Sequence, residues 1–317
     1  MNSASSNASD ITCLICGNHA EIAQTGLFDT RFGIRTVYSI ARCPVCGFEQ
    51  TTPLPSPEEI KSLYETYYNF GGESGTLYTR LRSLFLTSCL YRFWMVLDGD
   101  ISFHSRRGRG RLLDVGCNEG RGLAIYGKNG FSAEGLELNE NAANVARSQG
   151  FVVHTQLVER FEPTELYDVV VLSNVLEHSL EPTDMMAHVN RLLRPGGEVW
   201  ISCPNSNSIL RTLFGKYWLN WHLPFHISHF SVATLSSLLN KSGFDRLEVR
   251  QQTPALWVAQ SIITRLFARI GIPTVQLRNP ALVVLLMLTV RGILFPALWL
   301  GNKLGSGDCL ICTARKI

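Results

Sequence analysis

The segment from Leu112 to Gly120 restricts the possible folds more than any other part of the chain. It reads Leu-Leu-Asp-Val-Gly-Cys-Asn-Glu-Gly, so a short apolar run ends in an acid and a glycine-bearing turn follows. In an open α/β sheet, ligands bind beyond the carboxyl ends of the strands, where glycine lets the backbone come close to the ligand. A second apolar stretch ends in the acid Glu137, 23 residues after Asp114, and this spacing suits a carboxylate that binds ribose hydroxyls. Together these features predict a site for a nucleotide-like cofactor.

Patterns typical of strands and helices alternate along the chain after residue 110. Strands are expected at 111–115, at 131–137, near 151, near 168, at 197–203 and at 244–250. Helices are expected at 120–129, at 140–149, at 183–194 and between the Ser231 cap and Gly243. Alternation of this kind predicts a parallel sheet.

Four blocks make the chain resemble the class I S-adenosylmethionine-dependent methyltransferases over residues 111–250. They are the glycine turn, the Gly-Leu-Glu-Leu-Asn stretch around Glu137, and the ranges 167–178 and 192–205. The resemblance implies a Rossmann-like, doubly wound α/β fold with seven strands, of which the last, at 308–315, returns antiparallel between the two before it. The family's turn is Asp-x-Gly-x-Gly-x-Gly, whereas Asn118 occupies the middle glycine position here. Asparagine is the next best residue for a left-handed conformation.

The resemblance also implies how S-adenosylmethionine is bound. Gly116 and Gly120 let the turn approach the methionine part, Asp114 holds the turn and the amino group, and Glu137 accepts hydrogen bonds from both ribose hydroxyls. The adenine is expected near Gln156 and Leu157, and the end of the fourth strand lines the methionine side. The predicted cofactor-binding residues are Asp114, Gly116, Asn118, Gly120, Glu137, Leu138, Leu157, Ser173 and Asn174.

Four histidines are candidates for the acceptor site. Methyl transfer from a sulfonium aligns donor and acceptor and, for an oxygen or acidic carbon acceptor, removes a proton. His178 stands where relatives have an active-site histidine, and it is either a base or substrate contact or a helix-start residue bonded to the backbone. The loop 221–229 adds His222, His226 and His229, of which the last two are the better candidates. A metal bound by this loop is disfavoured, because no carboxylate joins its histidines and prolines break the local helix. The predicted catalytic residues are His178, His226 and His229.

Two Cys-x-x-Cys pairs near the N-terminus have the spacing of a zinc ribbon. The four cysteines are Cys13, Cys16, Cys43 and Cys46, with 26 residues between the pairs and a glycine after each pair. Such a site predicts a structural Zn²⁺ that is closed to substrate. Disulfides or a redox pair are the alternatives, but a redox pair does not need two copies. The remaining cysteines are expected to be buried small residues: Cys89, Cys117, Cys203, Cys309 and Cys312.

The composition favours a cytoplasmic enzyme with several parts. With 29 basic and 26 acidic residues the net charge is only +3, which provides no broad positive surface for nucleic acid. Residues 1–10 are polar and lack the apolar core of a secretory signal, so we expect a disordered leader. The expected parts are the leader 1–10, a zinc ribbon at 11–52, a connector and helical lid at 53–104, the cofactor-binding domain at 105–253 and 305–317, and an apolar helical insertion at 254–304.

In the connector, Ser56 and Glu59 form a predicted capping box that begins a helix running toward Tyr67. Tyr64, Tyr67 and Tyr68 are either part of a substrate lid or aromatic packing between helices, and a further helix is expected at 77–97.

The insertion at 254–304 is unusually apolar. Its first half predicts a basic amphipathic helix, with Ile262, Ile263, Leu266, Phe267 and Ile270 opposite Arg265 and Arg269. Its second half, 281–300, is long enough to span a bilayer, yet Arg291 at the midpoint costs about 2.5 to 3.5 kcal/mol on insertion scales. Both ends must return to one sheet, so a single crossing is excluded. A membrane-surface or lid role is favoured over core packing.

These observations predict an S-adenosylmethionine-dependent methyltransferase that acts on an oxygen or carbon atom, in preference to nitrogen, of a small molecule. The order of parts resembles bacterial enzymes of sugar and cell-surface polysaccharide metabolism, which implies a nucleotide-sugar or lipid-linked glycan acceptor. The insertion at 254–304 predicts peripheral contact with the inner face of the membrane. The alternatives are an RNA methyltransferase whose ribbon binds nucleic acid, and a non-catalytic adaptor that binds the cofactor.

Overall fold

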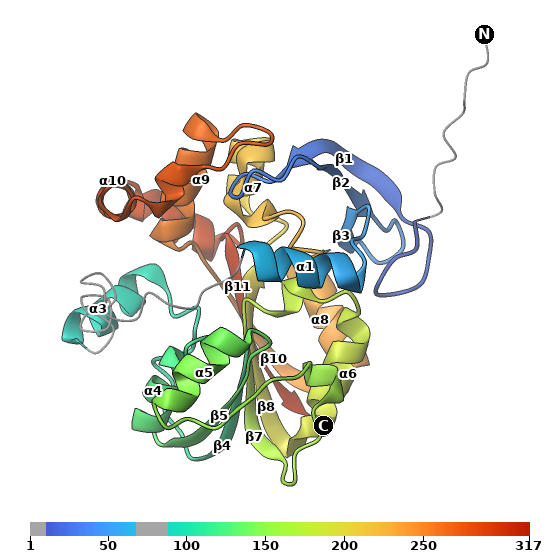
Figure 1. The fold of residues 1–317 in the computed structure, drawn as a ribbon, viewed down its shortest axis with the longest axis vertical. Helices are drawn as coiled ribbons and strands as arrows, with labels where there is room; N and C mark the ends of the chain where they lie inside the picture. The colour runs from blue at the N-terminus through green and yellow to red at the C-terminus, as the bar shows by residue number, and fades with distance from the viewer. Residues whose placement is uncertain (1–10, 68–87) are drawn as a thin grey trace.

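The structure is a computed structural model that describes residues 11–67 and 88–317, and these residues form two sheets (Figure 1). The larger sheet has seven strands in the order β10-β11-β8-β7-β4-β5-β6. Their bounds are β4 (Gly110–Val115), β5 (Phe131–Leu136), β6 (Val153–His154), β7 (Tyr167–Ser173), β8 (Leu193–Pro204), β10 (Phe244–Gln252) and β11 (Cys309–Lys316). β11 pairs antiparallel with both β8 and β10, whereas β5, β4, β7 and β8 run parallel. The predicted Rossmann-like sheet with an antiparallel last strand is therefore confirmed.

Helices cover both faces of this sheet. α4 (Arg121–Lys128) and α5 (Glu140–Ser148) lie on one side in Figure 1, and α6 (Pro182–Leu192) and α8 (Val232–Lys241) lie on the other. A strand that is covered on both faces is apolar throughout rather than alternating. β7 shows this, since all residues from 169 to 172 are buried. Ser231 caps α8 as predicted, because its hydroxyl accepts a hydrogen bond from the Thr234 amide.

β8 begins earlier than predicted. The Pro195-Gly-Gly sequence suggested that the strand starts at residue 197, but β8 starts at Leu193, directly after α6 ends at Leu192. The pairing of β8 with β7 shifts register between Tyr167 and Val169. Proline occurs in sheets near strand beginnings and bulges, where it need not donate a hydrogen bond to the neighbouring strand. Pro195 lies in the irregular start of β8, so the strand can include it.

The N-terminal cysteine segment forms a four-stranded sheet with a strand from far along the chain. Its strands are β1 (Glu21–Phe28), β2 (Val37–Arg42), β3 (Glu49–Thr52) and β9 (Ser228–His229), paired in that order. β9 belongs to the histidine loop, and its His229 pairs with Glu49 of β3. Phe48 also packs against Phe230, with ring centroids 5.3 Å apart. The cysteine segment and the histidine loop thus share one sheet, which the sequence did not predict.

The connector contributes α1 (Pro57–Tyr67), which crosses the end of the large sheet beside the N-terminal strands (Figure 1). Its predicted capping box is present: the Glu59 carboxylate accepts from the Ser56 amide at 2.7 Å, and the Ser56 hydroxyl accepts from the Glu59 amide at 3.2 Å. Of the helix expected at 77–97, the structure describes only α3 (Cys89–Asp98); Tyr68 and residues 77–87 lie outside the described residues.

Cys89 is exposed, so its predicted burial is wrong, whereas the other four cysteines outside the pairs are buried.

The apolar insertion folds as two helices. α9 (Ala255–Phe267) packs against α10 (Pro280–Lys303), and α7 (Ile209–Phe214) packs on α9 from the other side. The predicted apolar face of α9 is divided, since Ile263 is fully buried whereas Leu266 is exposed, and Ile270 lies beyond the end of the helix. Arg291 of α10 is buried and forms an ion pair with Asp98 at the end of α3. The central charge of α10 therefore points into the protein.

Candidate functional site

The glycine turn after β4 has the backbone conformation that its sequence predicts. Gly116, Asn118 and Gly120 all have left-handed φ angles, of 73°, 52° and 78°. The side chain of Glu137 joins the turn to the end of β5, because its carboxylate accepts from the Asn118 amide at 2.9 Å and from the Asn139 amide at 2.8 Å. A carboxylate has further lone pairs beyond these two bonds. The turn and Glu137 are thus held together, and Glu137 retains acceptor capacity for a ligand.

Asp114 is buried at the end of β4, below the turn. Burial and, to a smaller extent, the nearby charge of Glu137 together raise the pKa of its carboxyl to about 7. A buried carboxylate beside another acid is stabilised by a cation. The amino group of S-adenosylmethionine is such a cation, so the position predicted to hold it has the matching electrostatics.

The remaining predicted cofactor residues lie at the carboxyl ends of the strands. Ser173 ends β7, where its hydroxyl donates to the Ile101 carbonyl at 3.1 Å, and the Asn174 amide donates to the Ser202 carbonyl at 2.9 Å. Leu138 and Leu157 are exposed apolar side chains that follow β5 and β6. All of these residues therefore lie along one edge of the sheet.

Three of the four candidate histidines lie together. The ring centroid of His226 is 4.7 Å from that of His178 and 4.9 Å from that of His222. His229 is not part of this cluster: its Nε2 shares a hydrogen bond of 3.0 Å with the Thr51 hydroxyl, and its ring packs against Trp221. The structure thus brings His178 and His226 together and places His229 in the small sheet.

The helix α1 covers this cluster through Tyr64. The Tyr64 hydroxyl lies 2.9 Å from Nδ1 of His178, and its ring packs against Phe225 at 5.4 Å between centroids. Tyr67 instead packs against Phe32 at 5.2 Å. The position of Tyr64 over His178 therefore fits the lid interpretation, whereas that of Tyr67 fits aromatic packing.

The sequence reasoning missed Glu177. Its side chain is 1% exposed, and neither carboxylate oxygen has a hydrogen-bond partner among the described residues. Oε1 of Glu177 lies 3.9 Å from Nε2 of His226. A carboxylate therefore does lie beside the loop histidines, and the prediction that none joins them is wrong. The adjacency of Glu177 to His178 was the available signal, but it could not show that the loop folds back onto both.

Burial keeps the clustered histidines neutral. It lowers the pKa of His178 to about 4, against a raising effect of the Phe225 carbonyl, and it lowers the pKa values of His222 and His226 well below the usual range. Burial also raises the pKa of Glu177 to about 8. Neutral imidazoles can accept a proton or bind a metal ion.

The four predicted zinc ligands converge where the loop before β1 meets the loop between β2 and β3. Sγ of Cys16 lies 3.5 Å from Sγ of Cys43 and 3.5 Å from Sγ of Cys46, and the sulfurs of Cys13 and Cys46 are 3.6 Å apart. Four thiolates placed tetrahedrally around zinc at about 2.3 Å lie roughly 3.8 Å from one another. Each pair ends in a left-handed glycine, Gly17 or Gly47. The residues present therefore fit a zinc ion.

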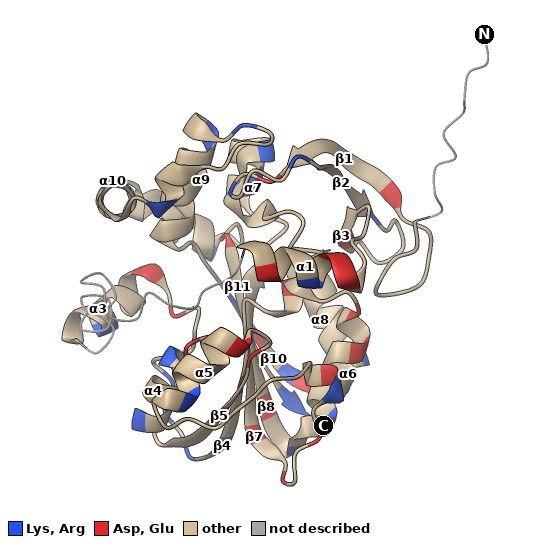
Figure 2. Cartoon of the chain, in the orientation of Figure 1, with Lys and Arg blue, Asp and Glu red and all other residues tan. Residues whose placement is uncertain are grey.

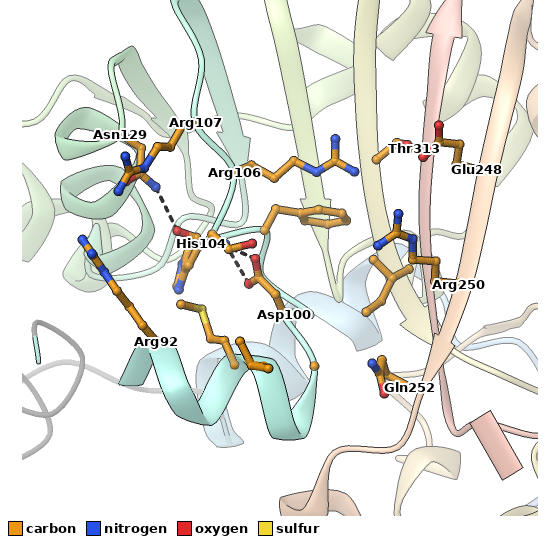
Figure 3. Close-up of a pocket in the computed structure, with 16 residues that line it drawn as sticks. Arg92, Asp100, His104, Arg106, Arg107, Asn129, Glu248, Arg250, Gln252 and Thr313 are labelled. Carbon is orange, nitrogen blue, oxygen red and sulfur yellow. Dashed lines mark hydrogen bonds between the residues drawn. The ribbon is translucent and has the colours of Figure 1, made fainter. Parts of the chain in front are cut away.

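A cavity of about 420 Å³ lies elsewhere, between α3, the following loop and strands β10 and β11 (Figure 3). Four arginines surround it: Arg92, Arg106, Arg107 and Arg250. It is lined by none of the predicted cofactor or catalytic residues. The cofactor is therefore expected at the carboxyl edge near Glu137 rather than in this cavity.

Comparison with known proteins agrees with this geometry. The profile of a methyltransferase domain matches residues 96–249. A ubiquinone biosynthesis O-methyltransferase of Thiobacillus denitrificans is 30% identical over 158 residues, which cover 45% of this chain and 68% of that protein. Another of the same name, from Shewanella sp. (strain ANA-3), is 32% identical over 36% of this chain and 52% of its own length.

A probable S-adenosylmethionine-dependent methyltransferase of Mycolicibacterium smegmatis is 31% identical over 42% of this chain and 51% of its own length. The chain spans about half the length of the first curated relatives that it matches. Among solved structures, the [4+2]-cyclase SpnF shares the fold, with a TM-score of 0.50 at 16% identity over 83% of this chain and 97% of that one. Together with the seven-stranded sheet, these matches show that the chain belongs to the class I S-adenosylmethionine-dependent methyltransferases.

Proposed function

We propose that the protein transfers a methyl group from S-adenosylmethionine to an oxygen or carbon atom, in preference to nitrogen, of a nucleotide sugar or lipid-linked glycan. The observation that carries this proposal is the cluster of neutral histidines beside the carboxyl edge of the sheet. Relatives named as O-methyltransferases favour an oxygen acceptor within this class. The sugar part of the proposal rests on the order of the ribbon, connector and tyrosine helix in the sequence.

Bound S-adenosylmethionine supplies an electrophilic methyl group. Glu137 binds the ribose, Asp114 neutralises the amino group, and the turn around Asn118 lies along the methionine part. His178 and His226 line the acceptor site, and the acceptor loses its proton there. Tyr64 and Phe225 orient the His178 ring through its Nδ1. Holding donor and acceptor in line supplies most of the rate enhancement in such a displacement.

The test is a transfer assay with methyl-labelled S-adenosylmethionine and three acceptor sets: nucleotide sugars, isoprenoid-linked glycans and RNA. We expect label in one of the two sugar sets and none in RNA, because a net charge of +3 gives little attraction to phosphate backbones. Methylation of RNA with salt-dependent binding would contradict the proposal and support the RNA alternative. Cofactor binding with transfer to no acceptor set would support the adaptor alternative.

We also propose that Cys13, Cys16, Cys43 and Cys46 hold a structural zinc ion. The sulfur separations and the two left-handed glycines support this assignment. Cys13 and Cys43 are buried, so the site has no open position for a substrate. Zinc at this position folds the loops that lead into β1 and β3, and through β9 it supports the histidine loop.

A third part of the proposal places the insertion on the inner face of the membrane. α10 is long and apolar enough to cross a bilayer by length and composition alone, and only 17% of its most apolar 18-residue window is buried. Its exposed apolar residues include Leu285, Leu288, Ile293, Trp299 and Leu300. Residues 254–304 contain five basic and no acidic residues, and Figure 2 shows blue but no red on α9 and α10. An apolar face rimmed by basic charge is typical of helices that lie on anionic membranes.

The full chain is expected to bind vesicles that contain anionic lipid, and Leu285→Asp combined with Trp299→Glu is expected to weaken this binding at least about tenfold, since each loses apolar contact with lipid. Co-sedimentation with vesicles measures it. Leu166→Asp is the matched control, because Leu166 is an exposed leucine outside the insertion. Equal binding of the double variant, the control and the wild type would refute a membrane role for α10.

A further inference from the structure

Three potential ligand groups converge beneath Tyr64, outside the cysteine site. Glu177 and His178 belong to the short helical turn η2 (Leu176–His178), and His226 comes from the loop before β9. One ligand atom from each of these residues lies within 4.8 Å of the other two. The Ile227 amide donates to the Glu177 carbonyl at 2.8 Å, so the backbone itself holds the loop against η2.

The hydrogen bonds of the two histidines determine which nitrogen is free to act as a ligand. Nδ1 of His226 lies 2.8 Å from the Asn220 carbonyl, and Nδ1 of His178 lies 3.0 Å from the Phe225 carbonyl. A carbonyl only accepts, so each Nδ1 carries the proton, which at His178 is shared between the Phe225 carbonyl and the Tyr64 hydroxyl oxygen, and each Nε2 presents a lone pair. Histidines that bind metals show this arrangement, in which the second nitrogen donates to a backbone carbonyl.

Glu177 supplies a third electron-pair donor with nothing to satisfy it. Both of its oxygens are buried and have no hydrogen-bond partner in the described part of the chain. Leaving a buried carboxylate without a donor is costly, and each such group in a native protein requires an explanation. Two lone pairs and a carboxylate therefore face one another without an intervening hydrogen-bond donor, which is an arrangement that a bound cation satisfies.

From this arrangement we infer that Glu177, His178 and His226 bind one divalent transition-metal ion, and this inference rests on the proposed function. Two imidazole nitrogens and one carboxylate form the ligand set of catalytic zinc sites and also suit Co²⁺ and Mn²⁺. His178 is only partly buried, and three protein ligands would leave a coordination position for the acceptor.

With the ion bound, an acceptor hydroxyl would lose its proton to water more readily, because the ion would stabilise the oxyanion. The oxygen would then form its bond to the methyl carbon while the carbon–sulfur bond breaks and sulfur keeps the electron pair. The positive charge of Arg31 lowers the pKa values of His178, His222 and His226. The Glu177 carboxylate supplies the negative charge that would offset the charge of the ion.

The test counts metal ions in the full-length protein. After dialysis against Zn²⁺, elemental analysis is expected to find two ions per wild-type chain, one in each site. Glu177→Gln and His226→Asn are each expected to retain one ion, and His154→Asn, a histidine outside the cluster, is expected to retain two. Cobalt titration separates the sites, since only a cysteine-bound ion gives intense thiolate charge-transfer absorption. The second, non-thiolate equivalent is expected to bind at least about 100-fold more weakly in the Glu177→Gln variant.

One ion per wild-type chain, with identical cobalt titrations of wild type and Glu177→Gln, would overturn the inference. Thermal unfolding and S-adenosylmethionine binding of each variant show whether it is folded. The two proposals fail separately: a wild-type chain that binds one ion, in the thiolate site, and still transfers methyl groups refutes the metal site and leaves the function standing. A second bound ion without transfer to any acceptor refutes the function and leaves the site standing.

Discussion

Glu137→Ala is expected to weaken S-adenosylmethionine binding at least about 100-fold, the largest loss we expect from a single substitution at the cofactor site. Two hydrogen bonds from ribose hydroxyls to a carboxylate contribute about 1.5 to 3 kcal/mol each. The substitution also removes the acceptor that holds the Asn118 and Asn139 amides, so the turn loses its link to β5. Isothermal titration calorimetry with wild type and variant measures the change.

Glu140→Ala is the matched control for this experiment. Glu140 lies three residues further along, is exposed on α5, and pairs with Arg147 rather than with the turn. We expect its cofactor affinity to stay within about twofold of wild type, because it loses the same charge outside the binding site. Equal affinity of the Glu137→Ala variant and wild type would show that Glu137 does not bind the ribose.

Arg291→Met is expected to lower the free energy of unfolding by about 3 to 5 kcal/mol, which is the usual cost of removing one partner of a buried ion pair. Arg291 and Asp98 are 8% and 7% exposed, so the substitution leaves a buried carboxylate whose remaining donors are the Ala255 amide, at 2.7 Å, and the Trp94 side chain. Urea unfolding at neutral pH measures the loss.

The pH dependence of the stability loss in Arg291→Met is a further check. Burial raises the pKa of Asp98, and the Ala255 amide and Arg291 lower it. Without Arg291 the carboxyl protonates more readily, so the loss of stability is expected to shrink as the pH falls.

Asp98→Leu combined with Arg291→Met is expected to recover most of the stability, because no buried charge remains. Arg278→Met, an exposed arginine of the same insertion, is expected to change stability by less than about 0.5 kcal/mol. An Arg291→Met variant as stable as this control would refute the account.

The sheet was predictable because its signals are local. The run that ends in Asp114 and the run at 167–173 are apolar on both faces, which is typical of central parallel strands, and the turn residues between strands and helices carry their own conformational preferences. Asn118 is an example: its left-handed φ follows from its place in the glycine turn. The capping box of Ser56 and Glu59 spans four residues and was predictable for the same reason.

The acceptor region was only partly predictable, because its contacts join distant segments. His178 and His226 were chosen from their places in the sequence, but their contact depends on how the loop folds back onto η2. The same loop supplies β9 to the cysteine sheet, which draws His229 away from the cluster. Residue spacing could not show which histidines meet, since neither η2 nor the histidine loop has a periodic sequence pattern.

The sequence by itself determined the order of strands and helices, the glycine turn with Asp114 and Glu137, and the cysteine pairs, because each depends on residues that are near one another in the chain. The tertiary structure decided which distant side chains meet. It turned Arg291 inward to Asp98 and left the outer face of α10 uncharged, and it enclosed Glu177 with two neutral histidines. Burial is the physical reason: whether a charge is paired, neutralised or left without a partner depends on packing between segments, which local sequence does not encode.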